Sequence, residues 1–427
     1  MKKLLAILLA MVMVFSMVSF AAAEAQTTIR LWTFPVWGTD GTFEPEIIAA
    51  FEAANPGVKI ELTTIDYQAG DDKLNAAIEA GTGPDVLLET PQRMNKYGLN
   101  GKMAPLDDMY TEEVLADFSA PDLMTIASLG NNGHYWTFPM SLTAHCMAIN
   151  EKQWTDSGAM EFVNLEGDRC WKTEDFIKAC EKLTEAGFLS SIVYCGGQGG
   201  DQGTRALVFN MYDAAFVNPE HTEWTIGSDA GKKALQQLKD MVDKGTISYD
   251  AGIVAGDELQ LFANGTVATS LCWNALQPKN YGDKMDFKAI PLPFPSEDGV
   301  PVLEAGLYGF GVFDKGDAAK VEMAKKFVAF ACRDAEWGVK AVQASKFFPV
   351  FKSLGDIYAD STDDQMPAYS SFIKYIGDLF NVMPSFVEQR PEWWGMLQYV
   401  FSGDKTVEQA VADYTTNCNK VQATYNK

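Results

Sequence analysis

The chain has few of the side chains that most enzymes use for metal or acid–base chemistry. Its three histidines, His134, His145 and His221, belong to no H-E-x-x-H or other metal-binding spacing. A G-x-S-x-G motif, which would mark a nucleophilic serine, is also absent. These absences argue against a metalloprotease or a serine hydrolase. Catalysis therefore finds little support in the sequence, and we expect no metal or other cofactor.

Cysteine is scarce and irregularly spaced. The seven thiols are an odd number and include no C-x-x-C pair. A disulfide framework is therefore not expected, although one pair could form in an oxidising compartment.

Positive charge is also scarce. The chain has 34 lysines and arginines against 57 acidic residues, which gives a formal net charge of −23. Nucleic acid and anionic membrane surfaces are therefore poor partners, and the acidity by itself indicates only a soluble surface.

Long apolar runs are absent after the start of the chain. The one such run, residues 4–18, follows two lysines and leads into the small residues at 21–25. This pattern is typical of a secretory signal peptide over residues 1–25, with cleavage after Ala23 or Ala25; a retained membrane anchor is the alternative. The signal peptide predicts export to the periplasm or the cell surface. No cysteine in or just after the apolar run could accept a lipid anchor (no lipobox).

The remaining 400 or so residues exceed what one hydrophobic core usually supports, which favours two lobes. At its start this region alternates predicted strands and helices. Residues 28–34, 59–65 and 85–88 are predicted strands, while 43–51 and 71–80 have helical periodicity. The order β-α-β-α-β predicts a parallel sheet covered by helices, with ligands bound beyond the carboxyl ends of the strands.

The same alternation continues downstream. Helices are predicted from Thr173, the expected N-cap, to Gly187, and at 230–244 and 319–331; strands are predicted at 267–273 and 306–313. Pro291, Pro293 and Pro295 mark an extended segment that needs no sheet partners, as a hinge would require.

An ordered series of short motifs resembles a known family over nearly all of the chain after residue 25. The motifs are Ile29-Arg30-Leu31-Trp32, the segment 51–58, Gly81-Thr82-Gly83-Pro84-Asp85-Val86, the segment 135–139 with Ile149-Asn150, the segment 262–268, Ile290-Pro291-Leu292-Pro293, the segment 306–312, Phe348-Pro349-Val350 and the segment 402–407. In this order and spacing they are similar to the extracellular solute-binding proteins of ABC importers, in the carbohydrate-binding branch that includes maltodextrin-binding proteins.

The resemblance implies an α/β fold, the two-lobed periplasmic-binding-protein fold of type II, with a ligand cleft between lobes joined by hinge segments. It places an N-lobe at 26–141 and 297–348, a C-lobe at 142–296 and 349–427, and hinges near 139–143, 291–296 and 348–350. It also implies a monomer that captures a mono- or oligosaccharide by lobe closure and delivers it to the transmembrane subunits of an ABC permease.

Aromatic rings that could stack on a sugar lie at several predicted loop ends. Trp37 follows the first strand and is expected to face the cleft. Trp273 matches a stacking position in the relatives, but it could equally pack under the cleft floor. Tyr308, between two glycines, could approach a ligand or face a helix. Trp393 and Trp394 lie near a segment from which relatives contribute a ring.

Candidate polar contacts follow the third strand. Glu89, Gln92 and Arg93 align with a sugar-contacting loop of the relatives. Gln92 replaces an acidic residue there, so the sugar preference of the relatives does not transfer directly.

Four further candidates lie elsewhere. Asp66 follows the second strand, where it could accept hydrogen bonds from hydroxyls or simply be solvated. Asn274 follows Trp273, and Asp201 and Asn210 belong to a glycine-rich segment, 196–203, and the helix after it. That segment lacks the Gly-Lys-Ser/Thr ending of a phosphate-binding loop.

Two alternative functions stay open at this point. A binding protein for a non-sugar solute, a polyamine or a polyol phosphate, would share the fold, but phosphate favours clustered cations and Arg93 is almost alone among the candidates. A secreted glycoside hydrolase would use two carboxylates about 5–10 Å apart. The two-lobe motif series argues against the hydrolase.

Overall fold

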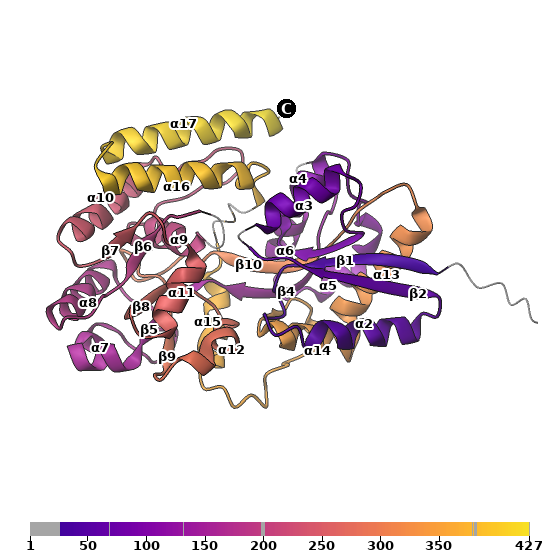
Figure 1. Ribbon diagram of the computed structural model, residues 1–427, viewed down its shortest axis with the longest axis horizontal. Coiled ribbons are helices and arrows are strands. Elements are labelled where there is room, and N and C mark those ends of the chain that lie inside the picture. Colours follow the sequence, from indigo (N-terminus) through magenta and orange to yellow (C-terminus); the bar gives the residue numbers. More distant parts are fainter. Residues whose placement is uncertain are drawn as a thin grey trace, which may run out of the picture.

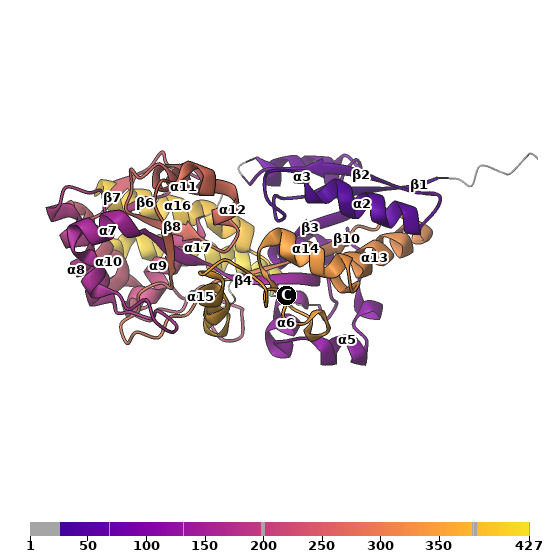
Figure 2. The same cartoon turned by 90° about the horizontal axis from the view of Figure 1, so that it is seen from below.

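The computed structural model describes residues 26–426 except 68, 131, 198–200, 378, 380 and 381, so the expected signal peptide lies outside the described residues. The chain is two-lobed. The lobes lie side by side, and β4 runs between them (Figures 1 and 2).

The first lobe is built on a mixed six-stranded sheet. In spatial order its strands are β11 (Phe348–Pro349), β4 (Phe138–Ala144), β10 (Ala305–Val312), β3 (Val86–Glu89), β1 (Thr27–Thr33) and β2 (Val58–Thr64). β1 pairs in parallel with both β2 and β3, which confirms the arrangement predicted from the β-α-β-α-β order. β10 and β11 are antiparallel to their neighbours and come from distant parts of the chain.

Seven helices of the first lobe, as far as the structure describes it, lie around this sheet. They are α2 (Phe43–Ala54), α3 (Gly70–Glu79), α4 (Pro91–Leu99), α5 (Glu112–Asp117), α6 (Pro121–Ser128), α13 (Ala318–Arg333) and α14 (Trp337–Ser345). In α2 the buried residues Ile47 and Phe51 follow helical spacing, and Phe51 meets Phe327 of α13 edge to face at 5.2 Å. This core therefore joins the start of the chain to a helix about 270 residues later.

The second lobe has a smaller β structure. A three-stranded sheet lies in the order β8 (Thr269–Trp273), β5 (Cys146–Asn150) and β9 (Ala289–Leu292), and β6 (Ile192–Tyr194) pairs in parallel with β7 (Ser248–Asp250). Around it lie α7 (Glu151–Ser157), α8 (Thr173–Glu185), α9 (Gln202–Met211), α10 (Asp229–Asp243), α11 (Ala255–Ala263), α12 (Gln277–Tyr281), α15 (Met366–Phe372), α16 (Phe386–Ser402) and α17 (Val407–Tyr425).

Single 3-10 turns occur in both lobes, at Asp107–Met109, Ala159–Phe162, Gly282–Lys284, Lys352–Leu354 and Ile373–Tyr375.

Two local predictions differ from the structure. Pro291 was expected in a segment without sheet partners, but it lies in β9 opposite Ala148. β9 is an edge strand, where a residue without an N–H is tolerated. The N-cap of α8 is Lys172, and Thr173 is the first helical residue.

The chain passes directly between the two sheets at His145. β4 ends at Ala144 and β5 begins at Cys146. The backbone N–H of His145 donates to the carbonyl of Glu304, which immediately precedes β10. Two crossing segments are therefore joined side by side at this point.

All seven cysteines are free thiols. Six are buried and Cys170 is half-buried. Burial raises the pKa of every one of these thiols above its ordinary value, because the thiolate would lose its hydration. No helix in the described part of the chain is both long and apolar enough to cross a membrane.

Candidate functional site

Residues of both lobes enclose a cavity of about 510 Å³. On the first lobe its wall includes Pro35, Asp66 and Glu89, which follow or end the parallel strands β1, β2 and β3. On the second lobe residues of α9, α11, α12 and α16 complete it. We refer to it as the inter-lobe cavity; its size is ordinary for a small-molecule site.

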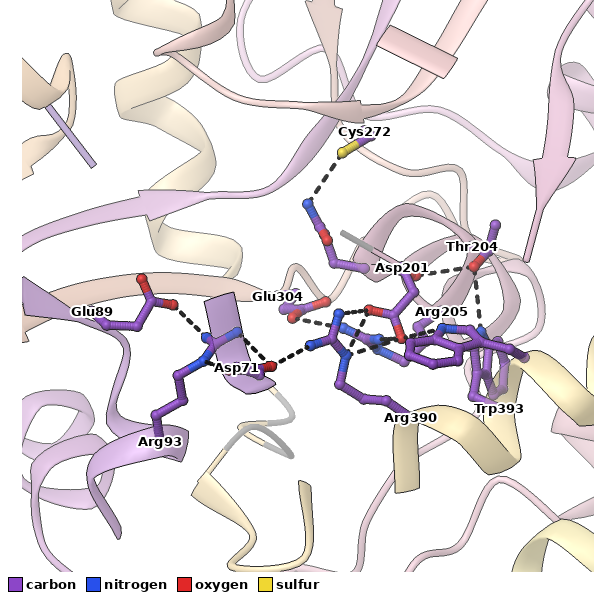
Figure 3. Close-up of polar contacts among 12 residues, drawn as sticks. Asp71, Glu89, Arg93, Asp201, Thr204, Arg205, Cys272, Glu304, Arg390 and Trp393 are labelled. Atoms are coloured by element: carbon purple, nitrogen blue, oxygen red, sulfur yellow. Dashed lines mark hydrogen bonds and ion pairs between the residues drawn. The ribbon is translucent and has the colours of Figure 1, made fainter. Parts of the chain in front are cut away.

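A row of alternating charges runs along this cavity from the first lobe to the second and ends at Glu304, immediately before β10 (Figure 3). We define the charge chain as Glu89, Arg93, Asp71, Arg390, Asp201, Arg205 and Glu304, each in contact with the next.

The first-lobe half of the charge chain is centred on Arg93. Pro91 starts α4, so Arg93 lies on its first turn, four residues after Glu89. Arg93 donates to Glu89 at 2.6 Å and forms a two-pronged pair with Asp71 of α3, one prong measuring 3.1 Å. Its guanidinium also lies 4.5 Å from the centre of the Phe34 ring. These contacts fix the side chain in a defined orientation.

The second-lobe half is centred on Asp201. Arg390 of α16 donates to Asp201 from Nη2 at 3.0 Å and from Nε at 3.2 Å, and its Nη1 lies 3.6 Å from Asp71 of the first lobe. Arg205, one turn after Asp201 in α9, pairs with Asp201 and donates to Glu304 at 3.4 Å. Arg390 therefore links the two lobes directly.

The charge chain shifts the ionisation of its members. Burial alone would raise the pKa of Asp201, but Arg205 and Arg390 hold it well below its usual range. Burial raises the pKa of Glu304 to about 7 despite Arg205, and it raises the pKa of Glu89 despite Arg93. Glu89 and Glu304, at the two ends of the charge chain, are thus less stable as anions than Asp201 in its centre.

His145 lies beside the Glu304 end of the cavity. Burial and the positive charge of Arg205 lower the pKa of His145 to about 4, so its imidazole is neutral at pH 7. It therefore adds no charge to the cavity wall.

Tyrosine and phenylalanine rings provide the apolar surface of the cavity. Tyr308 stacks on Phe347 with ring centres 5.1 Å apart, and Tyr67 stacks on Phe34 at 5.0 Å. Tyr281 and Phe386 line the second-lobe side. Such rings present flat faces suited to the C–H surface of a sugar.

Seven of the residues selected from the sequence lie in the cavity wall. They are Asp66, Glu89, Gln92, Arg93, Asp201, Asn274 and Tyr308. Most of them follow strands or begin helices at the edge where the carboxyl ends of strands meet. Their contacts with a ligand stay a prediction.

Three candidate tryptophans are buried, because large rings gain more from core packing than from partial exposure. For Trp37 this overturns the expected placement, while for Trp273 it is one of the two packings left open. Trp37 was expected to face the cleft, but it is 1% exposed and packs against Phe43 at 5.0 Å. Trp273 is fully buried, with its Nε1 donating to Tyr369 at 2.8 Å. Trp393 is likewise fully buried, and its Nε1 donates to the hydroxyl of Thr204 (Figure 3).

Two further candidates support the wall from behind. Trp394 is half-buried and donates from Nε1 to Asp201 at 3.1 Å. Asn210 is buried; it donates to the carbonyl of Val302 at 2.7 Å and accepts from its N–H at 2.8 Å. Asn210 thereby ties α9 to the segment that carries Glu304.

Sequence reasoning missed His145, Arg205 and Glu304 and gave Arg390 no site role. The i,i+4 spacing of Asp201 and Arg205 was a usable signal for a helical ion pair. Glu304 has no such signal, since it simply precedes a strand. Asp71 was seen only as part of a helix.

Direct contacts also join the lobes at the rim of the cavity. Lys279 of α12 donates to the carbonyl of Trp37 at 2.8 Å and lies 3.4 Å from Asp40. On another side Lys96 of α4 lies 3.1 Å from Glu388 of α16. Within the described ranges, no group of three or more His, Cys, Asp or Glu side chains could hold a metal ion.

Comparison with known proteins agrees with this architecture. The sequence profile of bacterial extracellular solute-binding proteins matches residues 46–368. An arabinooligosaccharide-binding protein of Bacillus subtilis is 25% identical over 370 residues, covering 84% of this chain and 81% of the relative.

Solved structures share the fold across almost the whole chain. An ABC substrate-binding protein of Listeria monocytogenes in complex with cycloalternan superposes with a TM-score of 0.77 at 20% identity, covering 93% of this chain and 99% of that one. A solute-binding protein of Thermotoga lettingae bound with α-D-tagatose gives the same TM-score at 18% identity, covering 93% of this chain and 100% of that one.

Proposed function

Because the chain belongs to the bacterial extracellular solute-binding proteins, we propose that it captures a mono- or oligosaccharide in the inter-lobe cavity and delivers it to an ABC permease. The protein works without catalysis, as a monomer, after export by its signal peptide to the periplasm or the cell surface.

One observation carries the proposal: the cavity is lined by both lobes. A ligand held there contacts both walls only when the lobes are together, so binding shifts the population toward the closed form. The permease then distinguishes loaded from empty protein by this closure.

The chemistry of the wall supports a saccharide. Tyr67, Tyr281 and Tyr308 offer ring faces, while carboxylates, amides and arginines between them suit hydroxyl groups. The relatives with stated ligands include an arabinooligosaccharide-binding protein and a cycloalternan complex. A mono- or oligosaccharide is the ligand class that agrees with both.

We infer that the lobes comprise 26–141 with 297–348 and 142–296 with 349–427. The two sheets support this division, since β10 belongs to the larger sheet of the first lobe and β5, β8 and β9 form the smaller sheet of the second lobe. β4 crosses the boundary at 141, as a hinge segment must. Limited proteolysis of the free and the saccharide-bound protein tests this division, with protection expected near residues 139–143 and 291–296.

A thermal-shift screen tests the function. The purified protein is heated with neutral mono-, di- and oligosaccharides, polyamines and polyol phosphates, and each hit is checked for breakdown by chromatography. A ligand at 100 times its Kd adds about 2.7 kcal/mol to the free energy of unfolding. Stabilisation by an intact saccharide supports the proposal; stabilisation by polyamines or phosphates alone, or cleavage of the sugar, contradicts it.

A further inference from the structure

The charge chain begins and ends with a carboxylate, Glu89 and Glu304, and in each of them only one of the two oxygens accepts a hydrogen bond from a described residue. Glu89 gives Oε1 to Arg93 and Glu304 gives Oε1 to Arg205. The other oxygen of each is buried and has no hydrogen-bond partner in the part of the chain that the structure describes. The two side chains are 1% and 5% exposed, and both line the inter-lobe cavity. Since buried polar atoms are nearly always satisfied, a ligand that donates to both ends would complete this arrangement.

The cationic groups of the cavity wall, by contrast, are already engaged. Arg93 contacts Glu89 and Asp71, Arg390 contacts Asp71 and Asp201, and Arg205 contacts Asp201 and Glu304. A carboxylate or phosphate would compete with these buried acids for the same guanidinium groups. Removing one member of a buried pair is strongly unfavourable.

The balance of charge in the wall has the same consequence. Five acidic side chains line the cavity against three arginines, namely Asp66, Glu89, Asp201, Asp257 and Glu304 against Arg93, Arg205 and Arg390. An anionic ligand would add like charge beside Glu89 and Glu304, whose ionised forms burial already disfavours. Hydroxyl groups carry no charge and face no such repulsion, and the excess of acidic over basic side chains favours an ammonium group over an anion.

Side-chain amides add further oxygens that could accept hydrogen bonds from a ligand. The side-chain oxygens of Gln92, Gln277 and Asn280 line the cavity and are buried, with no partner found for them among residues 26–426 as far as they are described. A hydroxyl can both donate to such an oxygen and accept from the NH₂ of the same amide. This surface therefore suits several neighbouring hydroxyls.

We propose that Glu89 and Glu304 select the ligand by charge: the inter-lobe cavity takes a saccharide that donates hydroxyl or ammonium hydrogen bonds to both carboxylates, and rejects saccharides that carry carboxylate or phosphate groups. The inference rests on the proposed function and deepens it by naming the class as non-anionic saccharides. Glu89 lines the cavity from the end of β3 and Glu304 from the residue before β10, so a ligand that reaches both contacts two segments that are distant in the sequence.

Calorimetric titration with saccharides of matched length tests the selection. The probes are two neutral trisaccharides, maltotriose and α-1,5-arabinotriose, the cationic triglucosamine, and the anionic trigalacturonate, together with glucose and glucose 6-phosphate. We expect at least one neutral or cationic probe to bind and both anionic probes to bind at least 100-fold more weakly. Anionic binding equal to neutral binding overturns the selection while leaving sugar capture intact. Failure of all six probes and of every sugar in the thermal screen overturns the proposed function itself.

Variants locate the selection in the two carboxylates. Glu89→Gln and Glu304→Gln keep the side-chain volume, and each is expected to weaken the neutral or cationic probe at least tenfold. The double variant should also lower the ratio between neutral and anionic affinities, which a merely structural role would leave unchanged. Glu258→Gln is the matched control, because Glu258 is equally buried but does not line the cavity. Unchanged affinity and ratio in the folded double variant would contradict the proposal.

Discussion

Glu258 is a buried acid that accepts hydrogen bonds and forms no ion pair with any residue that the structure describes. It accepts from the N–H of Leu271 at 2.7 Å and contacts the hydroxyl of Ser270 at 2.9 Å. Burial nevertheless raises its pKa from 4.5 to about 8, because these bonds replace only part of the lost hydration. Its folded-state pKa lies above its unfolded value, so its contribution to stability is fully present below pH 4.5 and is lost as the pH rises through 8.

We therefore predict that Glu258→Gln stabilises the protein in alkaline solution. Glutamine reproduces the protonated acid, with its oxygen accepting from Leu271 and its NH₂ donating to Ser270. The melting temperature of the variant should exceed that of the wild type by several degrees at pH 8.5 and by little at pH 4.5. Differential scanning calorimetry across this range measures the difference, and a gap that is constant with pH would contradict the assignment.

At the scale of residues, the positions that could be predicted are those fixed by strand ends. Asp66, Glu89 and Gln92 lie in the cavity wall because carboxyl ends of parallel strands meet at one edge. Tryptophan positions could not be predicted in the same way, since Trp37 follows β1 and Trp273 ends β8, yet both rings are buried in the core. The sequence indicates where in the fold a tryptophan lies, but not whether its ring faces the cavity or the core.

At the scale of elements, α17 depends on a reciprocal cap at its start. The hydroxyl of Thr406 accepts from the N–H of Gln409, and the side chain of Gln409 accepts from the N–H of Thr406. Thr406→Ala should lower the free energy of unfolding by about 1 kcal/mol. Thr416→Ala is the control, because Thr416 is exposed within the same helix and alanine is the better helix former there. Urea unfolding followed by circular dichroism compares them; equal destabilisation would argue against the cap.

Most elements could be predicted because their apolar periodicity agrees with their final burial. The expected strands at 28–34 and 59–65 correspond to β1 and β2 within a residue. α4 was not predicted, because residues 89–93 were interpreted only as part of a sugar-contacting loop, yet proline is favoured at a helix start. β11 has only two residues, too few for any periodicity, and it exists because β4 offers an edge to pair with.

At the scale of the whole molecule, Lys279 holds the rim of the second lobe against the first. We predict that Lys279→Met weakens binding of a saccharide about three- to tenfold, because the closed form loses a charged hydrogen bond to Trp37 and a half-exposed ion pair with Asp40. At saturating sugar, small-angle scattering should still give the compact form.

Lys284→Met is the matched control for this closure. Lys284 carries the same charge a few residues later but contacts Gln260 within its own lobe. Calorimetry should find its affinity unchanged. Equal losses in both variants would mean that long-range charge, and not the contact between lobes, explains the effect.

Neither lobe contacts nor the crossing at His145 could be predicted from local patterns. They depend on how two separately folded sheets meet, which is set by pairs such as Arg390 and Asp71, 319 residues apart in the chain. Chain length and family resemblance predicted the two-lobed arrangement, whereas the charge chain that links the lobes could be seen only in the structure.

The buried free thiols can report local opening of the structure without any added label site. An alkylating reagent modifies a buried cysteine only when the surrounding structure opens, so its rate of reaction measures the free energy of that opening. Cys332 samples α13 in the first lobe, whereas Cys180 and Cys418 sample α8 and α17 in the second. Mass spectrometry of the labelled peptides would thus follow each lobe separately in the natural sequence, with and without sugar.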